Sequence, residues 1–358
     1  MNGDNVDDDN SMDRKAPLRV ALLGAGIFAT NAHAPMIRKH PEIVQCIAVW
    51  SRRQESAETL IANVFDDGCN SDMLAYSGEQ GLHELLQSPD LDAIIMALPL
   101  DKQPEYVTMA LKAGKHVLSE KPIAPTVLEA KVLTDDYQTY FSSQLQWSVA
   151  ENFRYEPAIQ RTTEVVQNEI GNPFLFSLNM RMPFQPENPY LNTAWRNKPS
   201  WYGGLFVDAF VHATAMLRKI LGSEAKFISA ITSSQADYLP SVDTMAAHVE
   251  FQSGVQGSIA TTYACSSMKF ELEITGTKGT VLLQRKLDGP GYRITVNDNE
   301  VEEYGFGGIE GELLSFADAC RRGRDVDCNT PEEAMKDLMF VEACLKSGQN
   351  NGERITLV

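Results

Sequence analysis

The chain has 358 residues, of which 43% are hydrophobic and 22% are charged. This length corresponds to about two domains, and the composition is that of a globular protein, which excludes collagen-like and wholly disordered chains. The net charge of −17, without a local basic patch, argues against nucleic-acid binding, because phosphate backbones repel an acidic surface. The longest apolar stretch, residues 93–100, is too short to span a membrane.

The N-terminal segment and the cysteines indicate the compartment. Residues 1–17 contain five Asp and no apolar core, so we expect a disordered acidic tail and neither a secretory signal nor a transit peptide. The six cysteines are scattered without CxxC pairs, a spacing typical of neither a disulfide framework nor a zinc site. The sequence therefore predicts free thiols, no metal site and a cytoplasmic protein.

The first domain is predicted at residues 18–150, where short apolar runs alternate with helical patterns. Strands are expected at residues 18–23, 44–51, 75–77, 92–98, 116–119 and 146–150. Helices are expected at residues 27–39, 55–64, 81–87, 104–113 and 126–140. Apolar strands that alternate with helices favour a doubly wound parallel sheet covered on both faces, so this domain is of the α/β class.

The second domain is predicted at residues 151–358, where strands follow one another. Strands are expected at residues 174–182, 226–233, 245–251, 257–263, 269–275 and 280–284. Helices are expected at residues 157–168, 205–221, 310–321 and 331–347. Short turns between several strands indicate antiparallel pairing, so we predict an α+β domain with a largely antiparallel open sheet.

A GxGxxA motif, GAGIFA at residues 24–29, follows the first predicted strand and opens a helix. Gly24 and Gly26 allow a tight turn and close approach of a pyrophosphate, whose charge the helix N-terminus stabilises. Glycines also occur at ordinary strand–helix turns, but the surrounding βαβ pattern favours dinucleotide binding.

The end of the second strand indicates which dinucleotide is bound. An acidic residue there binds the ribose hydroxyls of NAD, whereas an arginine accommodates the 2′-phosphate of NADP. This chain has Ser51 at that place, followed by Arg52 and Arg53, so we predict NADP, with NAD as the less favoured cofactor. The alternative is that both arginines merely begin a solvated helix.

Three ionisable residues are candidates for the chemistry. Lys121 follows the fifth strand, where ligands bind in an open parallel sheet, and it could stabilise an alkoxide. Asp208 and His212 are four apart and share one face of an otherwise apolar helix, so Asp208 could hold His212 as a general base. The alternatives are a surface lysine and a core histidine with a structural hydrogen bond.

Taken together, these motifs resemble the Gfo/Idh/MocA oxidoreductase family. The resemblance rests on GAGIFA, AGKHVLSEKPIA (113–124), ENFRY (151–155), the Trp195-Arg196 pair, GGLFVDAFVH (203–212) and ITGTKGT (274–280). It implies a Rossmann domain, a C-terminal domain whose sheet forms dimers or tetramers, and a cis bond before Pro122. It also implies catalytic roles for Lys121, Asp208 and His212. The cofactor contacts implied by the resemblance are Gly24, Gly26, Ile27, Phe28, Ser51, Arg52, Leu98, Glu120, Lys121 and Asn152, and the charge argument adds Arg53.

The chain departs from the family pattern at several positions. Leu100 and Gln103 stand where many members have Asn and His, Phe210 replaces a usual Gly, and Ala215 replaces a common Asp. These changes put the substrate pocket in question, and Phe210 adds bulk to the helix that carries His212. Aromatic and basic residues that could line the pocket are Tyr155, Trp195, Arg196 and Tyr202.

We therefore predict an NADP-dependent oxidoreductase that acts on a secondary alcohol or carbonyl of a sugar, polyol or cyclic diol. The expected partners are a small-molecule substrate and further copies of the chain, with no nucleic acid and no membrane. Two alternatives remain open: a non-catalytic regulator that senses the cofactor, and a redox-neutral enzyme that uses the nicotinamide transiently.

Overall fold

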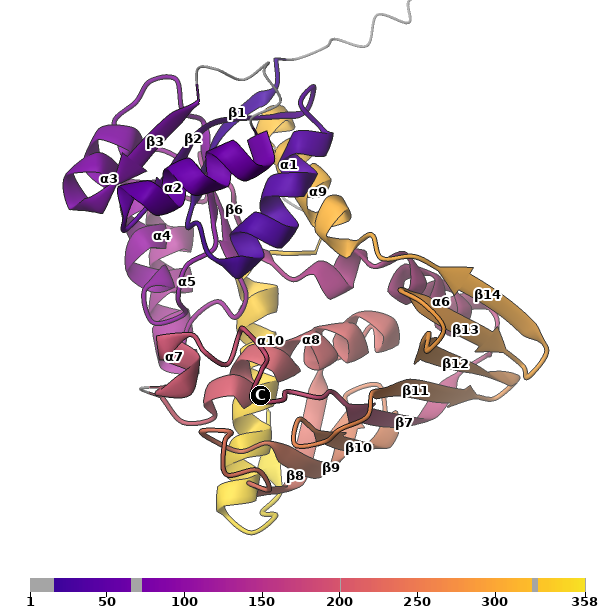
Figure 1. Cartoon of the computed structure of the whole chain (residues 1–358). Helices are drawn as coiled ribbons and strands as arrows, with labels where there is room; N and C mark the ends of the chain where they lie inside the picture. Colours follow the sequence, from indigo (N-terminus) through magenta and orange to yellow (C-terminus); the bar gives the residue numbers. More distant parts are fainter. Residues whose placement is uncertain (1–15, 66–72, 200, 324–327, 358) are drawn as a thin grey trace, which may run out of the picture.

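The computed structural model describes residues 16–65, 73–199, 201–323 and 328–357 (Figure 1). The first sheet has six parallel strands in the order β3-β2-β1-β4-β5-β6. They are β1 (Leu18–Leu23), β2 (Val44–Ser51), β3 (Leu74–Ser77), β4 (Ala93–Met96), β5 (His116–Glu120) and β6 (Trp147–Ala150). The strand order reverses between β1 and β4, the place where such sheets bind ligands beyond their carboxyl ends.

The strands at the centre of this sheet, such as β1 and β4, are mostly apolar and buried because both faces are covered. In β1, Ala21 and Leu23 face one buried cluster, whereas Val20 and Leu22 face the other. The covering elements are η1 (Ala29–His33) with α1 (Ala34–Lys39), α2 (Gln54–Leu60) with η2 (Ile61–Phe65), α3 (Gly78–Leu86), α4 (Gln103–Lys112) and α5 (Val127–Tyr140). The predicted fold class of this half is confirmed.

The second sheet has nine strands in the order β14-β13-β12-β11-β7-β10-β9-β8-β15. Of its pairings, β10 with β7 is parallel and the others are antiparallel. The strands are β7 (Pro173–Arg181), β8 (Ala225–Ser233), β9 (Thr244–Phe251), β10 (Gln256–Thr262), β11 (Lys269–Gly276), β12 (Gly279–Arg285), β13 (Tyr292–Val296), β14 (Glu300–Tyr304) and β15 (Ile355–Thr356).

Helices cover one face of the second sheet and leave the other open (Figure 1). The covering helices are α6 (Pro157–Asn168), α8 (Gly204–Leu221) and α10 (Pro331–Gln349). The prediction omitted β13, β14 and β15. β13 alternates buried with partly exposed residues, as a half-buried strand does. β14 is an acidic edge strand, EVEEY, which lacks the apolar pattern by which strands are predicted.

The chain returns to the first sheet near its C-terminus. Helix α9 (Gly308–Arg322) lies beside α1 (Figure 1), and its Leu313, Phe316 and Ala317 share a buried cluster with Val20 and Leu22 of β1. This return holds the two sheets on either side of one cleft. The predicted tail at residues 1–17 lies almost entirely outside the described residues. No described helix is long and apolar enough to cross a bilayer.

Candidate active site

A cleft of about 1680 Å³ lies between the parallel sheet and helix α8. Its volume exceeds the roughly 300–1,000 Å³ of a site for one small molecule, so it has room for a dinucleotide and a substrate. Most of the predicted site residues line it: Gly24, Gly26, Ile27, Phe28, Ser51, Arg52, Arg53, Leu98, Glu120, Lys121, Asn152, Trp195, Arg196, Asp208 and His212.

The register of the parallel strands brings the sequence motifs together. Leu23 pairs with both Trp50 and Met96, so the glycine loop, Ser51 and Ala97 leave the sheet side by side. Glu120 pairs with Ala150, which places Lys121 beside the residue that follows β6. Gly24 and Glu151, which are 127 residues apart in the sequence, therefore lie at the same edge of the parallel sheet.

The glycine loop has the geometry of a phosphate cradle. Gly24 has a φ of +111°, and a Cβ there would lie 2.3 Å from the carbonyl oxygen of Ala97, so no other residue fits. A Cβ on Gly26 would meet nothing within 4 Å, which leaves its backbone open to a ligand. The helix begins directly afterwards, at Ile27, and its N-terminus favours an anion.

The Glu120-Lys121-Pro122 turn is held by groups that the sequence prediction did not include. The Lys121–Pro122 bond is cis, as the resemblance implied. The buried Gln103 side chain donates hydrogen bonds to the carbonyl oxygens of Glu120 (2.8 Å) and Pro122 (3.0 Å). His33 of η1 contacts Glu120 Oε1 through its Nε2 at 2.6 Å. Gln103, one of the departures, thus supports the turn that carries Lys121.

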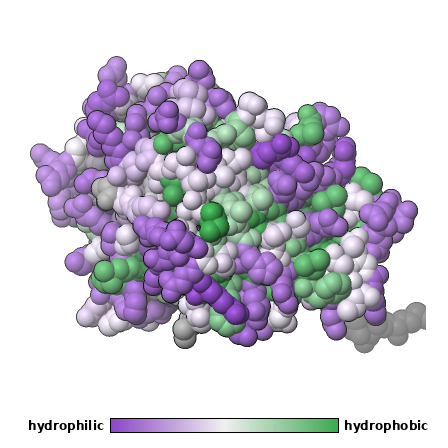
Figure 2. Space-filling view, turned by 90° about the horizontal axis from the view of Figure 1, so that it is seen from below, coloured by the Kyte–Doolittle hydropathy of each residue, from purple (hydrophilic) through white to green (hydrophobic). Residues whose placement is uncertain are grey.

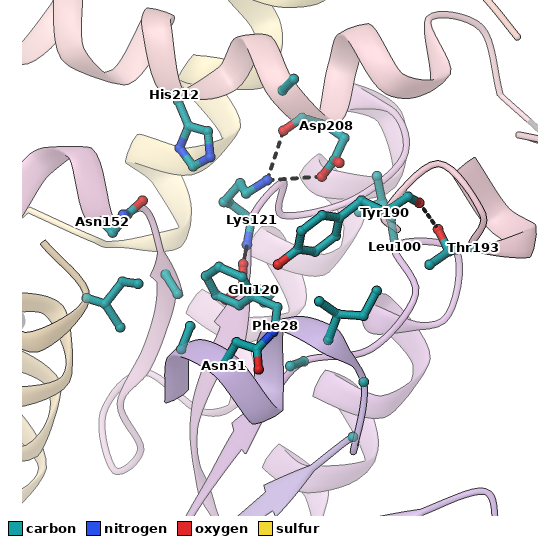
Figure 3. A pocket seen from close by; sticks show the side chains of 18 of the residues that line it. Phe28, Asn31, Leu100, Glu120, Lys121, Asn152, Tyr190, Thr193, Asp208 and His212 are labelled. Atoms are coloured by element: carbon teal, nitrogen blue, oxygen red, sulfur yellow. Dashed lines mark hydrogen bonds and ion pairs between the residues drawn. The ribbon is translucent and has the colours of Figure 1, made fainter. Parts of the chain in front are cut away.

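Asp208 is the partner of two cations. The Lys121 ammonium donates to the backbone oxygen of Asp208 (2.9 Å) and to its Oδ1 (3.0 Å) (Figure 3). Arg196 Nε donates to Oδ2 of Asp208 at 2.8 Å. Asp208 is 5% exposed. Burial alone would raise the pKa of its carboxyl, but the charges of Lys121 and Arg196 hold that pKa well below its usual range.

The acid that contacts His212 is Glu151 and not Asp208, so the predicted Asp208–His212 pair was wrong. Glu151 Oε1 lies 2.6 Å from His212 Nδ1, and the Phe153 ring stacks on the imidazole at 4.6 Å between centres. Burial opposes ionisation of Glu151, but His212 and then Arg154 lower the pKa of its carboxyl. Because Nδ1 is engaged, Nε2 is the nitrogen left for a substrate. Glu151 could have been predicted as a site residue from the sequence, because it is an acid that directly follows the buried strand β6.

Glu312 of α9 is a further buried acid on the cleft wall that the sequence prediction missed. It is 2% exposed, and neither carboxyl oxygen has a hydrogen-bond partner in the described part of the chain. Burial, together with the neighbouring carboxyls Glu120, Glu151 and Glu156, raises its pKa well above the usual value. Such a group favours its neutral form, which can donate a hydrogen bond.

Three residues that the sequence analysis connected with the substrate pocket, Tyr155, Tyr202 and Phe210, do not line the cleft. The Tyr155 side chain is directed toward α9, where its hydroxyl donates to Ser315 Oγ at 2.9 Å, and Phe153 takes the place expected for it. Tyr202 is half exposed and does not line the cleft. Phe210 is fully buried and stacks on Phe206 at 5.0 Å, so its bulk fills the core and leaves the cleft unobstructed. The prediction that Tyr155 lines the substrate pocket was therefore wrong.

Comparison with known proteins agrees with this geometry. Residues 18–139 match the oxidoreductase family with an NAD-binding Rossmann fold, and residues 163–357 match the C-terminal α/β domain of the same family. The chain is 32% identical over 342 residues to the dehydrogenase FPY6 of Fusarium mangiferae, covering 93% of this chain and 97% of that protein.

Two further similarities come from Thermotoga maritima. A myo-inositol 2-dehydrogenase is 25% identical over 205 residues, covering 56% of this chain and 58% of its own length. The crystal structure of an oxidoreductase superposes with a TM-score of 0.84 at 29% identity, covering 95% of this chain and 98% of that one. The chain therefore belongs to the Gfo/Idh/MocA family of nicotinamide-dependent oxidoreductases, as its motifs predicted.

Proposed function

We propose that the protein is an NADP-dependent dehydrogenase or reductase that acts on a secondary alcohol or carbonyl of a sugar, polyol or cyclic diol. The observation that carries the proposal is that Lys121 and His212 line the same cleft and lie on the side of it that faces Phe28 of the GAGIFA motif (Figure 3). The similarity to an inositol dehydrogenase supports the substrate class.

The residues present fit a dinucleotide: an open Gly26 at a helix N-terminus for the pyrophosphate, and two arginines at the end of β2. NADP, when bound, supplies a nicotinamide that accepts or returns a hydride. The protein's own task is then to hold the reacting oxygen and to move its proton.

In this proposal His212 Nε2 removes the hydroxyl proton as hydride leaves, and it returns that proton in the reverse reaction. Glu151 at Nδ1 stabilises the imidazolium that forms and holds the ring in position. Two of the three N–H groups of Lys121 are directed to Asp208, and the third can bind the substrate oxygen. Asp208 and Arg196 hold this lysine in place and do not themselves transfer protons.

The cofactor preference is tested by replacing Arg52 with alanine. We expect NADPH to bind about ten- to a hundredfold more weakly, because a charge-assisted hydrogen bond contributes about 1.5–3 kcal/mol. Binding of NADH, which lacks the 2′-phosphate, should change little. Fluorescence titration with both cofactors measures this effect, and Arg38→Ala, which removes an exposed charge of α1 outside the cleft, is the matched control. Equal losses for both cofactors would show that Arg52 does not contact the phosphate.

We further propose that the open face of the nine-stranded sheet joins copies of the chain. This face, seen from below in Figure 2, combines polar side chains with apolar ones, and Leu175 and Ile231 are at least half exposed. Sedimentation analysis of the purified protein tests this proposal, and a monomer at micromolar concentration would contradict it.

A further inference from the structure

The substrate half of the cleft has an apolar wall. The side chains that form it belong to the second sheet and its connecting segments, and they are mainly aromatic or thioether groups. They include Met180, Met182, Phe184, Phe270, Tyr292 and Phe306. Such a wall favours a ligand whose body is apolar, with polar groups at a few fixed points.

Arg285, the last residue of β12, lies at the end of this wall. Its guanidinium carbon is 4.2 Å from the centre of the Phe306 ring and 4.9 Å from that of Tyr292. Contact with two rings restricts the side chain, and the guanidinium also interacts with the Tyr292 hydroxyl. The other N–H groups around its edge can donate to an acceptor in the cleft. The arginine is thus a positioned donor within the cleft.

Arg285 has no ion-pair partner in the part of the chain that the structure describes. Across residues 16–65, 73–199, 201–323 and 328–357, no carboxylate forms an ion pair with it, whereas Arg196 in the same cleft is paired with Asp208. Arg285 acts electrostatically on Glu156, but Glu156 Oε2 accepts from the backbone N–H of Gly307 at 3.1 Å, and burial raises the pKa of this carboxyl. Burial also raises the pKa of Tyr292 to about 12, so the phenol stays neutral.

A continuous path of rings connects this cation with the reacting end. Phe153 stacks on His212, and its ring centre is 6.4 Å from that of Phe270, which in turn is 5.9 Å from that of Tyr292. A molecule lying along these rings would present one end to His212 and Lys121 and the other to Arg285. The apolar wall would cover the part between them.

We propose that Arg285 is a substrate-binding residue that recognises an oxyanion, either a carboxylate or a phosphate ester. The substrate is then a ring compound of apolar body that carries the reacting alcohol or carbonyl at one end and the oxyanion at the other. This inference rests on the proposed function and narrows its substrate class to the acidic members. A neutral polyol would leave this cation without a partner of opposite charge.

The test compares two probes of nearly the same shape, of which one carries an oxyanion and the other a neutral amide. Both are ring alcohols, 4-hydroxycyclohexanecarboxylate and its neutral amide, titrated calorimetrically into protein saturated with NADP⁺. We expect the carboxylate to bind at least about tenfold more tightly than the amide, since charge-assisted bonds to arginine are the stronger ones. A third probe, 4-hydroxycyclohexyl phosphate, identifies the oxyanion: the tighter of the two acids indicates the group that the natural substrate carries.

Three variants assign the preference to Arg285. Arg285→Gln should remove the difference between acid and amide. Arg285→Lys, which keeps the charge but not the planar fork, should keep part of the difference while weakening the acid severalfold. Lys286→Gln removes a neighbouring charge that is paired with Glu303 outside the cleft, and it should bind both probes as the unmodified protein does. Unchanged acid affinity in both Arg285 variants would overturn the assignment.

The same samples separate failure of this inference from failure of the proposed function. If NADPH binds normally but acid and amide bind equally, or neither binds, the oxyanion site is refuted and the dehydrogenase proposal stands. If no cofactor binds, the dehydrogenase proposal fails, and the titration without cofactor then decides the oxyanion site by the same acid-to-amide ratio.

Discussion

Replacing His212 with alanine is expected to lower kcat by about a hundred- to ten-thousandfold, the usual effect of losing a positioned general base. NADPH affinity should be nearly unchanged, because the proposed cofactor contacts are centred on the glycine loop and the end of β2. The variant is measured with a substrate found by screening secondary alcohols with NADP⁺, and its cofactor affinity is obtained by fluorescence titration.

The matched control for this variant is His83→Ala, the same substitution at an exposed position of α3 outside the cleft. It should retain full turnover. If His212→Ala also retained full turnover, His212 would have no part in the mechanism, and Glu151 would have only a structural role. Binding of NADPH without turnover of any substrate would favour the cofactor-sensing regulator, and turnover without net NADPH formation would favour the redox-neutral enzyme.

Replacing Asp208 with asparagine is expected to destabilise the fold by about 3–5 kcal/mol at neutral pH. The substitution removes a buried anion and leaves the two cations that it partners, Lys121 and Arg196, uncompensated. The same change should lower turnover, because Lys121 loses the group that positions it. Urea unfolding measures the stability, with Asp136→Asn, an exposed aspartate of α5, as the control.

The difference in stability between the unmodified protein and Asp208→Asn depends on pH, because the pKa of Asp208 is lowered in the folded state. In the unfolded chain this carboxyl has a pKa of about 4, whereas in the folded protein its pKa is lower. The ionised carboxylate therefore stabilises the fold fully only above about pH 4. Its contribution decreases as the pH falls further. The stability difference between the unmodified protein and Asp208→Asn should thus narrow below about pH 4. A difference that stays constant from pH 7 to pH 3 would contradict the ionised role of Asp208.

Local signals predicted much of the fold. Continuous apolar runs and helical periodicity place most elements of the first sheet within a few residues, because burial on both faces imposes that pattern on the strands themselves. A parallel sheet has the carboxyl ends of its strands at one edge, and the structure places Gly24, Ser51 and Lys121 there. The acidic strand β14 was missed because its solvent-facing composition carries no apolar pattern.

The site was predicted less completely because its contacts join distant elements. Spacing within one helix placed Asp208 and His212 on one face, which suggested that they interact. In the fold each instead meets a residue from another segment, Lys121 for Asp208 and Glu151 for His212, and electrostatic pairing across the cleft outweighs proximity along the helix. The position of Glu151 after a buried strand marks it as a candidate, but no local pattern says which of the two acids contacts His212.

By itself, the sequence determined the fold class, the glycine loop and the chemical types of most of the predicted groups that line the cleft, because these depend on local backbone demands and on side-chain identity. Gly24 illustrates this, since its φ of +111° excludes every other residue from that turn. Only the tertiary structure decided which acid contacts His212, which cations surround Asp208, and that Arg285 lies on two aromatic rings with no ion-pair partner among the described residues. The physical reason is that buried charges interact according to distance and burial in space, and both are set when the two sheets and the returning helix α9 close the cleft.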